Sequence, residues 1–101
     1  MVIPDEIRDL LWEYDLEGLD SDANLEDAVI ERVMQRGRWN QMRWLLRHMG
    51  RQRLRLFLED RGHRRLPPRE LRFWALLSGV PEETRNDWVH LARTREREWR
   101  G

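Results

Sequence analysis

The fold class is decided most clearly by one stretch of the sequence, Leu66-Pro67-Pro68-Arg69-Glu70-Leu71-Arg72-Phe73-Trp74-Ala75-Leu76-Leu77-Ser78-Gly79-Val80-Pro81. Proline is favoured in the first turn of a helix, so Pro67 and Pro68 predict a helix start. Apolar residues then recur at the three- and four-residue spacing of one helix face, at Leu71, Trp74, Ala75 and Leu77. Gly79 predicts the end of this helix, and Pro81 opens the next one. The stretch therefore predicts two consecutive helices joined by a tight turn.

Similar signals for the starts and ends of helices occur on both sides of this stretch. Helices are predicted from Pro4, from a cap at either Asp22 or Asn24, over about residues 39–49 and over about residues 52–60. The internal helices are predicted to end at three glycines, namely Gly37, Gly50 and Gly62. Residues 13–21 lack a sustained period and predict a loop.

The predicted inward positions follow the apolar stripe of each helix. They are Ile7, Leu10 and Leu11, then Leu25, Ala28, Val29 and Val33, then Met42, Leu45, Leu46 and Met49, then Leu54, Phe57 and Leu58, and finally Trp88 and Leu91. No segment alternates polar and apolar residues for long enough to form a strand. The sequence predicts an all-α fold, a compact single domain of five to six short helices joined by Gly/Pro turns.

Charge is distributed unevenly along a chain whose 19 basic and 19 acidic residues sum to zero. The acidic N-terminal segment, residues 1–31, has 11 acids against one Arg, a net charge of −10. The Arg-rich block, residues 32–75, has 13 Arg against three acids, a net charge of +10. The remaining residues, with the predicted C-terminal helix 81–99, are balanced. The split favours either a charged partner or the folding of acid onto base within one domain of 101 residues.

Catalysis and metal binding find little support in the sequence. There is no Cys, and neither serine lies in a nucleophile motif. The three histidines are scattered, and Asp87 with His90 supplies only two ligands for zinc. Asp20, Asp22, Asn24 and Glu31 match calcium-loop positions, but Leu25 stands where that loop needs Gly and starts an apolar helix stripe. We therefore expect no enzyme, no metal and no cofactor.

The sequence also bears on where the protein acts. No apolar stretch approaches the roughly 20 residues that cross a bilayer. The acidic N-terminus lacks the basic and apolar regions of a signal peptide. We expect a cytoplasmic protein without membrane contact.

Arginine and tryptophan occur together in Arg38-Trp39-Asn40-Gln41-Met42-Arg43-Trp44. Protein interfaces are enriched in both residue types. The predicted stripe of this helix places Trp39 near its edge and Trp44 nearly opposite, so Trp44 is the better candidate for an exposed anchor; alternatively, both rings belong to the core. The predicted partner-binding residues are Arg36, Trp39, Arg43, Trp44, Arg47, Arg51 and Arg55.

Two other functions remain open at this level. The Arg-rich block, with short helices and tight turns, is compatible with a DNA-binding regulator of the helix-turn-helix kind. The opposed charges of residues 1–31 and 32–75 are compatible with a self-associating homo-oligomer.

Several ordered blocks carry a resemblance to a known kind of protein. They are Trp12-Glu13-Tyr14-Asp15, then Val29-Ile30-Glu31-Arg32-Val33-Met34-Gln35-Arg36-Gly37, then Arg43-Trp44-Leu45-Leu46-Arg47-His48-Met49-Gly50, and then the stretch 66–81. Over about residues 11–88, the chain resembles small bacterial antitoxin-like proteins encoded beside abortive-infection (AbiE-type) nucleotidyltransferase toxins. The resemblance implies a non-enzymatic protein that binds and neutralises a toxin, with repression of its own operon as a further role.

Overall fold

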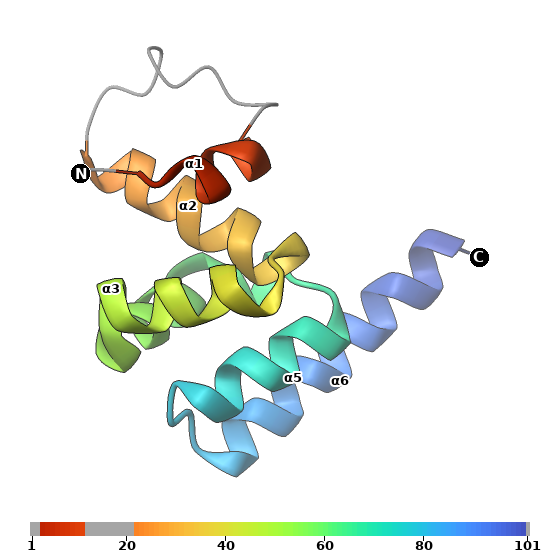
Figure 1. Cartoon of the computed structure of the whole chain (residues 1–101). Coiled ribbons are helices and arrows are strands. Elements are labelled where there is room, and N and C mark those ends of the chain that lie inside the picture. The colour runs from red at the N-terminus through yellow and green to blue at the C-terminus, as the bar shows by residue number, and fades with distance from the viewer. Residues whose placement is uncertain (1–2, 12–21, 101) are drawn as a thin grey trace. The chain divides into compact units, whose positions relative to one another are not determined.

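The computed structural model describes residues 3–11 and 22–100, which are helical apart from short connections (Figure 1). The elements are α1 (Asp5–Arg8), the 3₁₀ turn η1 (Asp9–Leu11), α2 (Asp22–Arg36), α3 (Trp39–Phe57), the π-helical turn η3 (Leu58–Gly62), α4 (His63–Arg65), α5 (Pro68–Leu77) and α6 (Glu82–Arg100). These two ranges contain no strand, so the predicted all-α fold class is confirmed. The predicted loop over residues 13–21 lies outside the described residues.

The chain falls into two compact units, Met1–His48 and Met49–Gly101. We call them the N-terminal unit and the C-terminal unit and describe each by itself. The N-terminal unit carries 6 Arg against 11 acids, a net charge of −5, and the C-terminal unit carries 13 Arg against 8 acids, a net charge of +5. Both units contain Arg residues of the block 32–75.

The core of the N-terminal unit is built on α2. Ala28, Val29 and Val33 are buried, as their spacing predicts, and Ile30 and Met34 are buried beside them. The apolar face of α2 is therefore wider than the predicted stripe. The turn η1 packs against α2 (Figure 1), and Ile7 of α1 and Leu11 of η1 are buried. Because α2 is helical from Asp22 onward, residues 22–31 do not adopt the calcium-loop conformation.

Glycine interrupts α3 where the sequence predicts a helix end. Gly50 has φ 80° and ψ 159°, a backbone region that essentially only glycine adopts. The helix therefore stops and restarts at this residue, as predicted. The end of α2 before Gly37 is confirmed as well.

The predicted helix end at Gly62 is wrong. Gly62 has helical φ and ψ, and the chain stays helical to Arg65. A Cβ atom at Gly62 would lie 2.8 Å from the Phe57 ring and 2.9 Å from a Leu58 methyl group. This glycine therefore permits a close approach of buried side chains. The helix ends instead at Leu66, whose extended backbone is the conformation favoured before a proline.

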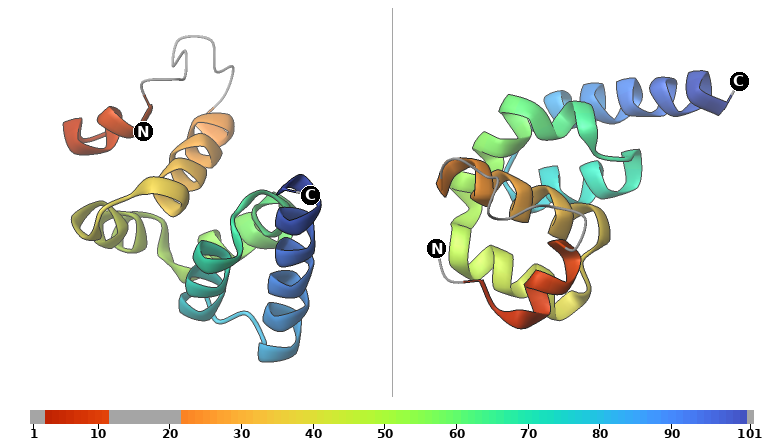
Figure 2. Two further views of the ribbon diagram at one scale, coloured as in Figure 1. Left: turned by 90° about the vertical axis from the view of Figure 1, so that its right-hand side faces the viewer. Right: turned by 90° about the horizontal axis from the view of Figure 1, so that it is seen from above.

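The C-terminal unit is organised around α5 and α6, which lie side by side (Figure 2). Helix α5 begins at Pro68, and its turn to α6 closes with hydrogen bonds from the Val80 N–H to the Ala75 carbonyl and from the Gly79 N–H to the Leu76 carbonyl. Gly79 has φ 77°, and the whole is a Schellman motif. The predicted pair of helices with a tight turn is thereby confirmed.

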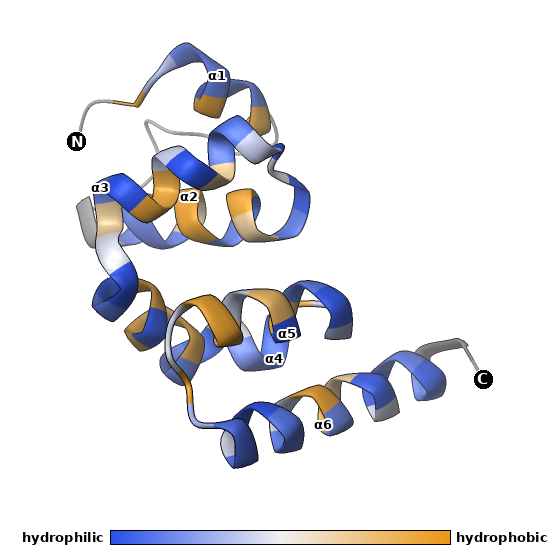
Figure 3. Ribbon diagram, turned by 60° about the horizontal axis from the view of Figure 1, so that its bottom comes forward, coloured by the Kyte–Doolittle hydropathy of each residue, from blue (hydrophilic) through white to orange (hydrophobic). Residues whose placement is uncertain are grey.

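The buried positions of the C-terminal unit agree with the sequence except in α6. Phe57, Leu58, Leu71 and Trp74 are buried as predicted. Leu91, predicted inward, is 58% exposed, and this prediction is wrong. The buried stripe of α6 runs through Val89 and Ala92, three residues apart, and Leu91 lies beside it on the helix surface. Figure 3 shows why the stripe is hard to read, since α6 is hydrophilic along most of its length.

Candidate partner-binding surface

Gln41 sets the orientation of the first half of α3 in the N-terminal unit. Its side chain is buried, accepting a hydrogen bond from the Arg38 backbone N–H at 2.6 Å and donating one to the Glu6 carbonyl oxygen at 2.6 Å. The first contact is half of a capping box, in which the third helical residue satisfies the N–H that precedes the helix. The second fastens α1 to α3. Beside it, the Asn40 amide donates to the Glu6 carboxylate at 2.7 Å.

The buried Gln41 reverses the predicted exposure of the two tryptophans. Trp39 is 63% exposed, and Trp44 is half-buried, so the prediction that Trp44 is the more exposed ring is wrong. Gln41 and Leu45 are four residues apart and define the buried face. Trp39 stands two residues before Gln41 and so lies across the helix from it. Trp44 stands three residues after Gln41 and flanks the buried face.

Trp44 is held in a stack with His48. Their ring centroids are 4.8 Å apart and the planes differ by 9°. The two residues are one helical turn apart, the spacing at which side chains on a helix surface meet. The stack restricts the Trp44 rotamer before any partner binds, which lowers the entropy cost of an interface made with this ring.

Around this stack lies a hollow of about 480 Å³, which we call the α3 cleft. It is lined by Glu6, Asn40, Arg43, Trp44, Arg47 and His48. Three of the predicted partner-binding residues, Arg43, Trp44 and Arg47, are therefore brought together. Asn40, His48 and Glu6 complete the lining and were not predicted. For Asn40 and His48, the signal in the sequence is a spacing of four residues from Trp44 on the same helix. Glu6, on α1, has no such signal.

The electrostatics of the α3 cleft favour an anion. Arg43 and Arg47 are exposed and make no ion pair with any residue that the structure describes. Like charges one turn apart on a helix repel by a few tenths of a kcal/mol. Glu6 is the one acid among the described residues of the lining, and its carboxylate accepts a hydrogen bond from Asn40. A carboxylate or phosphate placed between the two guanidinium groups would remove this repulsion and could be bound by both.

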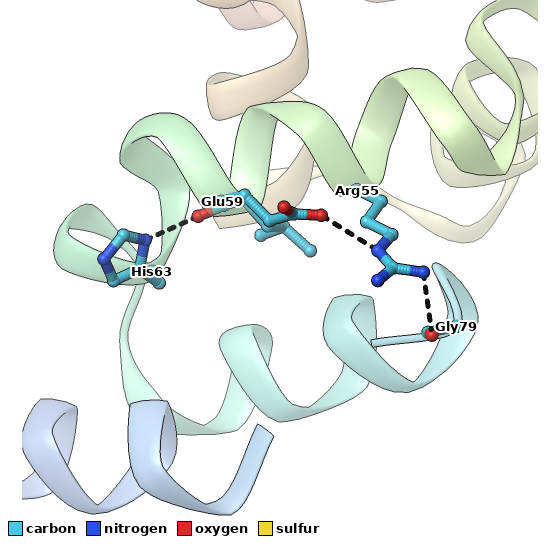
Figure 4. Close-up of polar contacts among 5 residues, drawn as sticks. Arg55, Glu59, His63 and Gly79 are labelled. Carbon is cyan, nitrogen blue, oxygen red and sulfur yellow. Dashed lines mark hydrogen bonds and ion pairs between the residues drawn. The ribbon is translucent and has the colours of Figure 1, made fainter. Parts of the chain in front are cut away.

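The other predicted partner-binding residues lie elsewhere. Arg36 is exposed at the end of α2 and has its own contacts. Arg51 and Arg55 belong to the C-terminal unit, beyond Gly50. Figure 4 shows Arg55 between two groups of that unit: its Nε donates to Glu59 at 2.9 Å, and a terminal nitrogen donates to the Gly79 carbonyl at 3.5 Å. The local contacts of Arg55 are thus to its own unit.

His48 and His63 belong to different units, and each ring stacks on a tryptophan. His63 Nδ1 lies 2.6 Å from the Leu58 carbonyl oxygen and so donates to it (Figure 4), and the ring stacks on Trp88 at 4.9 Å. His48 belongs to the α3 cleft, and Ser78 is buried at the end of α5. Over residues 3–11 and 22–100, no three His, Asp or Glu residues lie close enough to hold a metal ion.

The chain belongs to a family of unknown function (DUF6922), whose model matches residues 7–57. The match covers α2, all of α3 and every predicted partner-binding residue, and it ends before η3. No curated protein and no solved structure matches the chain. None of the helices that the structure describes is both long and apolar enough to cross a membrane.

Proposed function

We propose that this chain is a non-enzymatic, antitoxin-like protein of the bacterial cytoplasm that binds and neutralises a partner toxin through the α3 cleft. The nucleotidyltransferase encoded beside such proteins is the proposed partner, on the resemblance of residues 11–88. The observation that carries the proposal is the α3 cleft, in which two arginines that make no ion pair with the described residues lie beside a tryptophan stacked on His48; Trp39, 63% exposed, lies on the same helix outside this lining.

The chemistry of these residues fits a protein partner better than a small substrate. Buried Trp and Arg anchors supply most of the binding energy in protein interfaces. The guanidinium groups of Arg43 and Arg47 would meet carboxylates of the partner, while the indole of Trp44 and the exposed Trp39 provide apolar area. An acidic groove on the toxin is therefore the complementary surface.

Co-expression with the neighbouring nucleotidyltransferase tests the proposal directly. We expect the two proteins to co-purify and the chain to restore growth of cells that express the enzyme. The double variant Arg43→Ala/Arg47→Ala should weaken the complex about 100-fold or more, since an interface arginine at a hot spot contributes about 2 kcal/mol or more. Its growth rescue should be lost.

The matched control is Arg93→Ala/Arg97→Ala, which removes the same charge from exposed positions of α6. It should leave the complex and the rescue unchanged. No complex and no rescue with the unaltered chain would refute the proposal. A control variant as defective as the α3 variant would show that net charge, and not the α3 cleft, governs binding.

A further inference from the structure

A second basic surface lies in the C-terminal unit, between α5 and α6. Two adjoining hollows of about 420 and 400 Å³ share Arg93 and Glu96. We call this surface the α5–α6 groove. Its lining is Pro67, Pro68, Arg69, Glu70, Arg72, His90, Arg93, Glu96 and Arg97. Arg93 and Arg97 follow the Arg-rich block in the sequence. Because α5 packs against α6 (Figure 2), Arg93 shares a hollow with Arg69 and Arg72 of that block.

The charges of the α5–α6 groove are not balanced. Four arginines are exposed and make no ion pair with the described residues, namely Arg69, Arg72, Arg93 and Arg97. Two acids stand among them. Glu96 has its own contact, and Glu70 is half-buried on α5. The groove therefore presents an excess of guanidinium groups along two neighbouring helices.

The spacing of these arginines suits an extended anion. Arg69 and Arg72 are three residues apart on α5, and Arg93 and Arg97 are four apart on α6. Side chains at these spacings are helix-surface neighbours, about 5–6 Å between Cβ atoms. The result is two short rows of donors along two adjoining hollows: Arg69 and Arg72 line the first, Arg97 lines the second, and Arg93 lines both. A single carboxylate would engage one row at most, whereas a chain of phosphates could engage both.

The α5–α6 groove differs from the α3 cleft in the groups that surround its arginines. Among the described residues, its lining has no Trp, Tyr, Phe or aliphatic side chain apart from Pro67 and Pro68, and its one aromatic ring is the imidazole of His90. A protein interface needs a buried apolar centre, which this surface does not offer. Phosphate contacts need charge and little apolar burial. We propose that the α5–α6 groove binds the phosphodiester backbone of a nucleic acid.

The binding mode follows from the residues present. Guanidinium groups donate to phosphate oxygens, position the nucleic acid and carry no sequence information. The N-terminal turn of α6 bears Glu82 and Glu83, so it is unsuited to enter a groove of DNA. The proposal is thus sequence-independent backbone binding. It does not depend on the toxin, because it uses a different unit of the chain.

Fluorescence anisotropy with a labelled duplex DNA and a labelled single-stranded RNA tests this proposal on the full chain alone. Four phosphate contacts predict a slope of log affinity against log salt of about −3.6 for the duplex, at about 0.9 per contact. Affinity should then fall roughly 100-fold between about 50 and 200 mM salt. Comparison of the two probes tells whether duplex or single strand is the better source of the phosphates.

Variants decide whether the α5–α6 groove is responsible. Arg93→Gln/Arg97→Gln should reduce the slope by about 1.8, the loss of two contacts. Arg43→Gln/Arg47→Gln, which removes the same charge from the α3 cleft, should leave the slope unchanged. Glu70→Gln should strengthen binding, because it removes a repulsive carboxylate. All altered side chains except Glu70 are exposed, and thermal unfolding confirms that each variant is folded.

Three results would overturn the proposal. They are no binding of either probe at about 50 mM salt, equal slopes for the two double variants, and displacement of the nucleic acid by polyglutamate at equal charge concentration. The last result would assign the groove to an acidic protein. Since no toxin is present in these measurements, their failure leaves the proposed function of the α3 cleft untouched, and the reverse also holds.

Discussion

The two units of this chain fasten their helices in different ways. In the N-terminal unit, the buried hydrophobic side chains that the structure describes are aliphatic or Met, and Gln41 bonds to a carbonyl of α1 from 35 residues away. In the C-terminal unit, Phe57 and Trp74 lie in the core, and Arg95 donates to the carbonyl oxygens of His63 at 3.0 Å and Arg64 at 2.5 Å. Each of these two residues makes a part-buried, long-range polar contact, which we call a clamp: the clamp is a neutral buried amide in the N-terminal unit and a guanidinium group in the C-terminal unit.

The two units therefore differ in which interactions contribute most to their folding stability. A buried amide leaves two backbone groups unsatisfied when it is removed, whereas a guanidinium group at a helix end is partly replaced by water. The C-terminal unit can rely on a solvated clamp because its aromatic core buries a large area. The N-terminal unit has no buried aromatic side chain among the residues that the structure describes, so we expect it to depend more on its clamp. The substitutions below test this ordering.

Trp74→Ala should have the largest effect. The indole is 1% exposed in the core of the C-terminal unit, and truncation of a buried Trp costs about 3–5 kcal/mol. Urea denaturation followed by circular dichroism measures this loss. Phe73→Ala removes the adjacent, partly exposed ring and is the matched control, for which we expect a clearly smaller loss. Equal losses would show that Trp74 is not the centre of this core.

Gln41→Ala should follow in size. It removes both hydrogen bonds of the clamp, leaving the Arg38 N–H and the Glu6 carbonyl without that partner, at a cost of about 1–3 kcal/mol. Hydrogen exchange should increase first in α1 and η1. Asn40→Ala, which removes only an exposed hydrogen bond to Glu6, should have little effect on exchange. Equal exchange in the two variants would contradict the role assigned to Gln41.

The sequence predicts the helices of this protein better than their faces. Pro67, Pro68, Gly50 and Gly79 act through local backbone geometry, so the ends that they mark follow from the sequence alone. Gly62 is also a glycine, but it is needed for tertiary packing, because the side chains of Phe57 and Leu58 lie where its Cβ atom would be. No local pattern distinguishes these two uses of glycine.

The candidate site was predicted in its residue types but not in its geometry. Arg43, Trp44 and Arg47, which the Arg/Trp composition singles out as candidates for partner binding, line one cleft. The exposure of Trp39 and Trp44 was reversed because the prediction took only apolar residues as inward. Gln41 is polar, and it is buried because of a carbonyl 35 residues away, which no helical period records. The capping box offers a partial signal, but Arg38 stands where its usual Ser or Thr would.

Arg95→Ala should have the smallest effect of the three substitutions. Arg95 is half-buried, and its two hydrogen bonds end on carbonyl groups at the end of the short helix α4. Water can reach these carbonyls in the variant, so we expect a loss of about 1 kcal/mol or less. Thermal unfolding at low and high salt measures this loss of stability.

Arg95→Lys is the matched variant, because it retains the charge but not the bidentate geometry of the guanidinium group. If the Lys variant is as stable as the unaltered chain, charge at the end of α4 suffices; if it resembles Ala, the bidentate contact is what matters. A loss larger than that of Gln41→Ala would reverse the ordering of the two clamps and show that the C-terminal unit depends on its polar contact more than on its aromatic core.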